Sequence, residues 1–353
     1  HCRRAGMTAP GKTPGVPGAK LLFPERSGLI YSADVPAWLD EFCAAPEMRR
    51  LRGVGMNCGC EYTAFPRFRG LPPYSRFRHS VGVCLIVWRF TGDMVQALAG
   101  LFHDIATPCF AHTVDFLRGD YMAQESTEDR TEGIIRASAV ITRLLDKYGV
   151  APGAVTDYHM YSIADNDSPC LSADRLEYTL GNLEGYGLCD MAALQAYYDG
   201  IIAAEAENGA AELAFTDVDT ARRFAHDALK MSRIYVADED RYAMQMLSEL
   251  LRRAVEKGVL TSEELYLTEA DVIARLTGDG ELCARWQEFR AMHRMLTRAE
   301  DAPGGAWRVI RAKKRYIDPL VAGRGRLSKI DAGFAAEAAA FLAAPQDAPL
   351  CAI

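Results

Sequence analysis

The order of apolar and polar residues predicts helices along most of the chain, beginning with two in its first third. A helix is expected over 79–90, where the apolar run VGVCLIVW is closed by Gly92, a residue type favoured just past a helix end. The next is expected over 94–105, because Asp93 and Gln96 have the spacing of a capping box. Both segments are thus bounded by recognisable helix signals.

Helical patterns continue through the middle of the chain. Pro108 interrupts the pattern, and a short helix is expected to follow over 110–119. A longer helix is expected over 128–149, a segment that ends in a glycine. Ser172 is a favourable N-cap for a further helix over 173–187.

Beyond about residue 190 the helical patterns dominate again, for example over 220–258 and 334–344. Strand signals are few. The best of them lies over 306–317, which predicts one arm of a hairpin. The pattern as a whole predicts an all-α fold.

The composition is that of an ordinary globular protein, with 49% hydrophobic and 25% charged residues. The formal net charge of −7 argues against nonspecific nucleic-acid binding, so a local basic cluster would have to hold any anionic ligand. The longest apolar run, VGVCLIVW, is far too short to span a membrane. Ten scattered cysteines without a C-x-x-C pair fit a reducing compartment, and we expect a cytoplasmic location.

Four residues at the predicted helix ends carry metal-binding side chains: His79, His103, Asp104 and Asp174. Imidazole nitrogens and carboxylate oxygens suit one divalent ion, such as Mn, Fe, Zn, Mg, Ni or Co. At a helix end the geometry relaxes, so the adjacent His103 and Asp104 can both reach one ion. Such a pair alone is more often a helix cap or a surface pair, so the surrounding motifs decide between the two interpretations.

Three segments carry a family resemblance, namely SRFRHSVGV (75–83), GLFHDIATPCFAH (100–112) and SADRLEYTL (172–180). Their order of R-x-x-H, H-D and D-R-L-x-Y motifs resembles the HD-domain metal-dependent phosphohydrolases. Within them it most resembles the deoxynucleoside triphosphate triphosphohydrolase branch. The matching stretch covers about 51–185, under half of the chain. The resemblance implies a helical bundle whose metal ligands are His79, His103, Asp104 and Asp174.

We expect three parts along the chain. Residues 1–20 are rich in Pro, Gly and Lys and are expected to be a disordered leader. Residues 21–190 are expected to form the HD-domain core, and 191–353 a helical region packed on that core. The expected fold is therefore an all-α HD-domain helical bundle with an additional helical C-terminal region.

The resemblance also implies residues beyond the metal ligands. His112 and Asp115 would form a pair that transfers a proton or positions the nucleophile, since a spacing of three residues places them on one face of a short helix. Arg76 would contact phosphate through its guanidinium fork. Arg175 and Tyr178 would line the nucleotide pocket. For His112 a position inside the apolar core is the alternative.

Two positions depart from the family pattern. Many members read H-D-I-G-H, but Thr107 stands where the last histidine of that motif would be. Many also carry a His-Glu pair in the next helix, whereas the segment here contains Glu128 and no histidine. Glu128 or Glu132 is the candidate replacement as an acid, which requires a raised pKa. These departures affect the predicted type of reaction more than the predicted metal site.

The densest basic run is RAKKRYIDP at 311–319. Such a run is usually a solvated surface. The functional alternative is that Lys313, Lys314 or Arg315 folds over substrate phosphates or meets an effector nucleotide. The helical C-terminal region also leaves room for an interface in a homo-oligomer.

The leading hypothesis is metal-dependent hydrolysis of a phosphate ester or anhydride of a nucleotide, with a deoxynucleoside triphosphate as the substrate that the resemblance favours. The expected partner is thus a nucleotide or another phosphorylated small molecule, and not a membrane. One alternative is a phosphodiesterase or phosphomonoesterase acting on another metabolite. The other is a nucleotide-binding regulator whose metal site is structural or weakly active.

Overall fold

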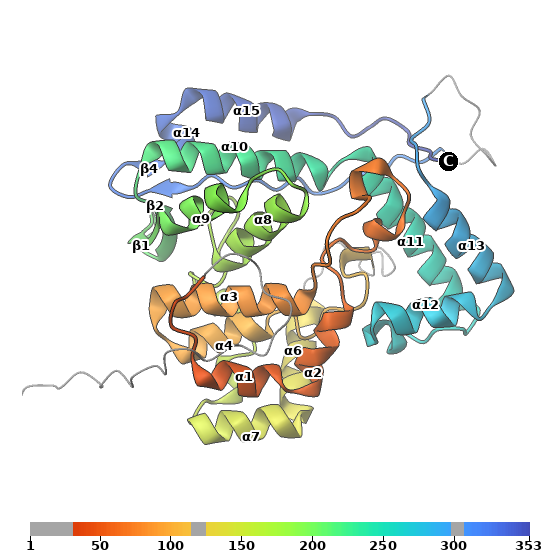
Figure 1. Cartoon of the computed structure of the whole chain (residues 1–353), viewed down its shortest axis with the longest axis horizontal. Helices are drawn as coiled ribbons and strands as arrows, with labels where there is room; N and C mark the ends of the chain where they lie inside the picture. Colours follow the sequence, from red (N-terminus) through yellow and green to blue (C-terminus); the bar gives the residue numbers. More distant parts are fainter. Residues whose placement is uncertain (1–30, 114–124, 298–306) are drawn as a thin grey trace, which may run out of the picture.

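A computed structural model describes residues 31–113, 125–297 and 307–353, leaving out the side chains of 125–129. Its described part is mainly helical, as the sequence predicts (Figure 1). The first half contains the helices α1 (Ala37–Cys43), α2 (Pro46–Arg50), α3 (Arg76–Thr91), α4 (Met94–Phe102), α6 (Glu125–Ala137), α7 (Ala139–Tyr148) and α8 (Ala173–Gly185). The second half contains α9 (Met191–Asp199), α10 (Val218–Ile234), α11 (Asp238–Glu256), α12 (Glu269–Thr277), α13 (Gly280–Ala291), α14 (Leu327–Ile330) and α15 (Ala332–Ala343). Short 3₁₀ turns are η1 (Leu51–Gly53), η2 (Cys60–Tyr62), η3 (Pro66–Phe68), η4 (Pro152–Ala154), η5 (Tyr158–Met160) and η6 (Glu264–Tyr266).

Local chemistry sets the predicted helix ends. Gly92 ends α3 in the left-handed conformation, with a φ of 63°. Asp93 begins α4 by accepting hydrogen bonds from the backbone of Val95 and Gln96. The predicted helix over 128–149 is divided in two, because the side chain of Ser138 caps a new helix, α7.

The expectation of a strictly all-α fold is wrong in one respect, because a small four-stranded sheet is present. Its strands are β1 (Ile201–Glu205), β2 (Ala211–Phe215), β3 (Leu320–Val321) and β4 (Gly325–Arg326), in the order β1-β2-β3-β4. The β1–β2 and β3–β4 pairs are antiparallel, and β2–β3 is parallel. The buried guanidinium of Arg326 fastens the sheet by donating to both carboxylate oxygens of Glu212, at 2.6 and 2.8 Å.

The predicted hairpin arm over 306–317 is also wrong. Within the described residues 307–317, pairing is limited to one isolated bridge between Arg308 and Leu350. The segment does alternate between exposed and buried side chains, as at Val309 and Ile310. That alternation therefore occurs in an extended segment that, among the described residues, forms only this one bridge. The ammonium of Lys314 donates to carbonyls at the end of α15.

Two apolar clusters fill the interior. The larger one is built around α1, α3, α4, α7, α8, α10 and α15, and the smaller one around α11, α12, α13 and the 3₁₀ turns that precede α3. In Figure 1, α3 and α4 lie together in one half of the molecule, α10 and α15 run side by side across the other, and α11–α13 gather at one end. The expected boundaries at residues 20 and 190 stay predictions. Among the described helices, none is long and apolar enough to cross a membrane.

Buried carboxyl groups join the segment 55–66 to helix α12. The carboxylate of Glu269 accepts from the backbone N–H of Gly55 at 2.8 Å and from the hydroxyl of Tyr62 at 2.9 Å. Burial, followed by the nearby charge of Glu269, raises the pKa of Glu61 to about 8. Glu61 is therefore protonated in the folded protein over a pH range in which it is ionised in the unfolded chain.

The raised pKa of Glu61 predicts that the protein becomes less stable as the pH rises. The unfolded chain releases this proton near the ordinary glutamate pKa of about 4.3, whereas the folded protein keeps it up to about pH 8. The free energy of unfolding should therefore fall between these two values. Glu61→Gln should flatten that dependence and increase stability at pH 8, measured by urea unfolding from pH 5 to pH 8. Substitution of the exposed Glu288 by Gln is the control, and equal slopes in both variants would contradict the assignment.

Candidate metal centre

Three helix ends, from α3, α4 and α8, meet at the candidate site. The side chain of Ser75 caps α3, which places His79 in the first turn of that helix. His103 and Asp104 directly follow the last residue of α4. Ser172 caps α8 and places Asp174 in its first turn. Helix α3 packs against both α4 and α8, so the three ends converge.

The predicted metal-binding side chains come together. One ligand atom from each of His79, His103 and Asp104 lies within 4.8 Å of the other two. The two Nε2 atoms are 3.1 Å apart, and Oδ2 of Asp104 lies 3.4 Å from Nε2 of His103. Asp174 closes the group, with its Oδ1 at 3.0 Å from Nε2 of His79 and 3.9 Å from Nε2 of His103.

Both imidazoles are held so that Nε2 faces the group. Nδ1 of His103 lies 2.7 Å from the carbonyl oxygen of Gly100, which can only accept a hydrogen bond. Nδ1 of His79 lies 2.5 Å from the carboxylate of Glu177. A proton on each Nδ1 leaves Nε2 as the nitrogen that presents a lone pair, which is the form that binds metal ions.

Glu177 is a site residue that the sequence analysis missed. It is fully buried, and besides His79 it accepts hydrogen bonds from the hydroxyls of Tyr74 at 2.5 Å and Tyr31 at 3.3 Å. Glycines make room for this network, since a Cβ at Gly82 would lie 2.5 Å from the side chain of Glu177. Its position three residues after Asp174, on the same face of one helix, is the sequence signal that could have identified it.

Asp104 is held as an anion by its neighbours. Burial alone would raise its pKa, but the guanidinium of Arg76 and the two imidazoles together lower it well below the usual range. Nη1 of Arg76 lies 3.1 and 2.9 Å from the two carboxylate oxygens. Thr107, at the position that departs from the family motif, donates to Oδ1 at 2.7 Å. The hydroxyl of Thr107 therefore helps to position the candidate ligand Asp104.

Two further candidate ligands, His79 and Asp174, are coupled electrostatically. Burial lowers the pKa of His79, but its hydrogen bonds to Asp174 and Glu177 outweigh this and raise the pKa to about 10. Burial likewise opposes ionisation of Asp174, whose pKa is nonetheless lowered, chiefly by the hydrogen bond from His79. The site thus favours one additional positive charge, which a divalent cation would supply in place of the proton on His79. Two oriented imidazoles and two ionised carboxylates fit such an ion.

No known family model matches the chain. It is 25% identical over 256 residues to the uncharacterized protein YdhJ of Bacillus subtilis, an alignment that covers 70% of this chain and 74% of that one. It is 26% identical over 306 residues to the metal-dependent phosphohydrolase cns2 of Cordyceps militaris, which covers 81% of both chains. The name of the second relative states the activity class that the HD-domain resemblance implies.

The predicted pocket residues of α8 lie in different surroundings. The ring of Tyr178 borders the group, 6.4 Å from the ring of His79. Arg175 instead bonds the loop before α8, where its Nη1 lies 3.1 Å from Asp165 and its Nε donates to the carbonyl of Cys170 at 2.7 Å. Tyr158 approaches from η5, with its hydroxyl 3.3 Å from Oδ2 of Asp174.

The segment that leads to His112 has a strained backbone. The helix expected over 110–119 begins only at residue 112, because Phe110 and Ala111 have φ values of 56° and 43°. The hydroxyl of Thr113 anchors the segment by donating to the carbonyl of Cys58 at 3.0 Å. His112 is exposed, which contradicts the alternative of a core position.

Other predicted site residues lie apart from the group or outside the described residues. Lys313 is exposed, and Lys314 is bound to the end of α15. Asp115 falls outside the described residues. Glu128 lies in α6, but its side chain is not among those described. Their expected roles stay predictions.

The contact between Glu177 and His79 predicts an effect on metal affinity. Glu177→Gln keeps the size of the side chain but removes the charge that orients and polarises the imidazole. Losing such a partner typically costs about 10–100-fold in metal affinity. The measurement is divalent-metal content after dialysis against a series of buffered metal concentrations. Glu184→Gln, on the same helix and paired with Arg78, is the control, and equal affinities in the two variants would contradict the prediction.

Proposed function

We propose that this protein is a metal-dependent phosphohydrolase of the HD type that acts on a phosphorylated small molecule, with a nucleotide as the favoured substrate. The observation that carries the proposal is the convergence of His79, His103, Asp104 and Asp174, with both imidazoles fixed through Nδ1. The similarity to the phosphohydrolase of Cordyceps militaris supports the activity class.

The four converging side chains would hold one divalent ion. When bound, such an ion supplies Lewis-acid chemistry toward a phosphate oxygen. Imidazole and carboxylate donors accept Mn, Fe, Zn, Mg, Ni or Co, so the donor set does not select one of them. Glu177 would keep the imidazole of His79 oriented for each of these ions.

Arg76 has a dual role in the proposal. Its Nη1 holds Asp104, whereas its Nε has no hydrogen-bond partner among the described residues. The guanidinium is buried and charged, so a phosphate group bound near it would be stabilised without additional desolvation of the arginine. Substitution of Arg76 would therefore affect both substrate binding and the position of Asp104.

Proton transfer is assigned to His112, with Asp115 and Glu128 as the acidic residues of the same step. The exposure of His112 supports this, because an exposed imidazole is accessible to a substrate. The absence of the usual histidine beside Glu128 leaves His112 as the preferred group to protonate the leaving oxygen.

Aromatic rings near the candidate ligands support a substrate that carries a base. Tyr178 lies beside His79, and the ring of Tyr158 is 4.9 Å from that of His103. From the basic run, Arg315 is near enough to influence Tyr178, whose pKa is raised to about 12 chiefly by burial, against the charge of that arginine. Arg315, rather than Lys314, is thus the preferred basic residue for substrate phosphates.

The experiment that tests the proposal is metal analysis of the purified protein followed by an activity screen. The screen should pair each metal with nucleoside mono-, di- and triphosphates, cyclic nucleotides and simple phosphomonoesters. Release of triphosphate, release of orthophosphate or opening of a cyclic ester identifies the reaction. Tight nucleotide binding without turnover under every metal would instead favour a nucleotide-binding regulator.

Loss of one candidate ligand should abolish both metal binding and activity. His103→Ala removes an Nε2 donor from a four-residue set, so we expect metal content and hydrolysis to fall to background. The control is His226→Ala, because that histidine pairs with Glu337 on a different part of the surface. A His103→Ala protein with full metal content and full activity would overturn the proposal.

Substitution of His112 should separate proton transfer from metal binding. We expect His112→Ala to keep its metal and to lose about 100-fold or more in kcat, the usual scale of general acid–base catalysis. His293→Ala, at an exposed position after α13, is the matched control. An unchanged kcat in the His112 variant would remove this residue from the mechanism.

A further inference from the structure

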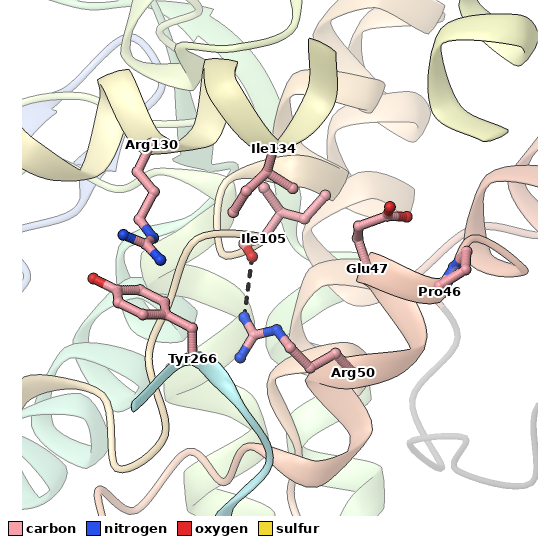
Figure 2. Close-up of a pocket in the computed structure, with 7 residues that line it drawn as sticks. All are labelled: Pro46, Glu47, Arg50, Ile105, Arg130, Ile134 and Tyr266. Carbon is pink, nitrogen blue, oxygen red and sulfur yellow. Dashed lines mark hydrogen bonds between the residues drawn. The ribbon is translucent and has the colours of Figure 1, made fainter. Parts of the chain in front are cut away.

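A pocket of about 360 Å³ lies behind the turn that follows Asp104. Its walls include Arg50 and Glu47 from α2, Ile105 from the turn itself, Arg130 and Ile134 from α6, and Tyr266 from η6. Figure 2 shows Arg130 and Tyr266 on one side and Glu47 on the opposite side, with the two isoleucines between them. The four candidate metal ligands do not line this pocket.

Arg50 brings a partly unsatisfied guanidinium to the pocket wall. Its Nη2 donates to the carbonyls of Ile105 at 3.0 Å and Thr107 at 2.7 Å, as Figure 2 shows for the first of these bonds. Its Nη1 is buried and has no hydrogen-bond partner in the described residues. A buried donor of this kind is costly unless a ligand or a water molecule accepts from it.

Arg130 supplies a second guanidinium with a free donor. The group lies 3.3 Å from the ring centroid of Tyr266, and its Nε is buried without a hydrogen-bond partner among the described side chains. Burial lowers the pKa of Arg50, and the charge of Arg130 lowers it further. The two positive groups are therefore close enough to repel each other, and an anion placed between them would relieve that repulsion.

A carboxylate already binds one of these arginines from the solvent side. Oε2 of Glu263 lies 2.7 Å from Nη2 of Arg130, but the side chain of Glu263 is 77% exposed. An exposed ion pair of this kind contributes only about 0–1 kcal/mol to stability. A ligand anion could therefore take the place of this carboxylate at little cost in free energy.

We propose that the pocket binds a small phosphate monoester, with its phosphate between Arg50 and Arg130 and its uncharged part on Ile105 and Ile134. The size of the pocket suits a small ligand, and arginine forks match the oxygens of a phosphate group. Glu47 faces the other end, where a hydroxyl or amino group of the ligand would meet its carboxylate. The proposal does not depend on the reaction at the metal centre.

A ligand bound in this pocket would influence the candidate metal centre through the side chain of Arg50. Arg50 holds the two carbonyls that bracket the turn, and Asp104 immediately precedes the first of them. A ligand that engages Nη1 of Arg50 would leave both of these bonds in place. Because the bound anion would restrain the guanidinium that holds these two carbonyls, occupation of the pocket should stabilise the turn.

The test measures binding of inorganic phosphate and of benzylphosphonate, which resists hydrolysis, by calorimetry. Chelated protein is compared with metal-loaded protein so that anions bound at a metal ion are recognised. We expect Arg130→Gln to weaken binding at least about tenfold and Glu263→Gln to tighten it, because the first removes a donor and the second a competing anion. Arg136→Gln, at an exposed arginine on the same helix paired with Glu132, is the matched control and should not change binding.

Ile134→Trp gives a second route, because it fills the pocket without altering either arginine, and it should abolish binding of benzylphosphonate. Binding that all variants share, or that disappears on chelation, would place the anion at the metal centre and overturn the proposal. Failure of the wild-type protein to bind either probe would also overturn it. Inactivity in the phosphohydrolase screen would leave these binding results intact, so the two proposals fail separately.

Discussion

The close packing of helices α3 and α8 is the constraint on which the candidate site depends. It places a fully buried carboxylate, Glu177, against an imidazole whose other nitrogen faces three further polar side chains. The approach is possible because Gly82 and Gly181 have no side chain, since a Cβ at Gly181 would lie 2.4 Å from the hydroxyl of Tyr74. Helix α8 consequently supplies both a candidate ligand, Asp174, and the group that orients a second one, His79.

The sequence predicts those features that depend on local chemistry. Gly92, Asp93 and Ser172 mark helix ends correctly because capping involves only residues a few positions apart. The four candidate ligands were also predicted, from the motifs of a family resemblance, and they converge in space. The small sheet was missed although Asn208 and Gly209 form a strong hairpin signal, because the flanking strands are rich in Ala and Glu, which favour helices.

Contacts between distant segments could not be predicted in the same way. The role of Arg76 toward phosphate stays a prediction, and the sequence did not indicate that its side chain also pairs with Asp104, 28 residues away. Thr107 was noted as a missing histidine, and only the folded chain brings its hydroxyl against the same carboxylate. Arg175, which was expected to line a nucleotide pocket, pairs with Asp165 in the loop before α8, a contact that the sequence did not indicate. Each outcome depends on which side chains tertiary packing brings together.

The hydrogen bonds of Asp104 also bear on which ions the centre would accept. Its Oδ1 accepts a hydrogen bond from the hydroxyl of Thr107, and Nη1 of Arg76 donates to both carboxylate oxygens. Its Oδ2 lies 3.9 Å from Nε2 of His79 and 3.4 Å from Nε2 of His103. With Oδ1 engaged in these hydrogen bonds, Asp104 would coordinate a metal ion through one oxygen rather than two. Calcium, which takes six to eight oxygen ligands, would therefore be a poor occupant, and smaller ions with fewer ligands would be preferred.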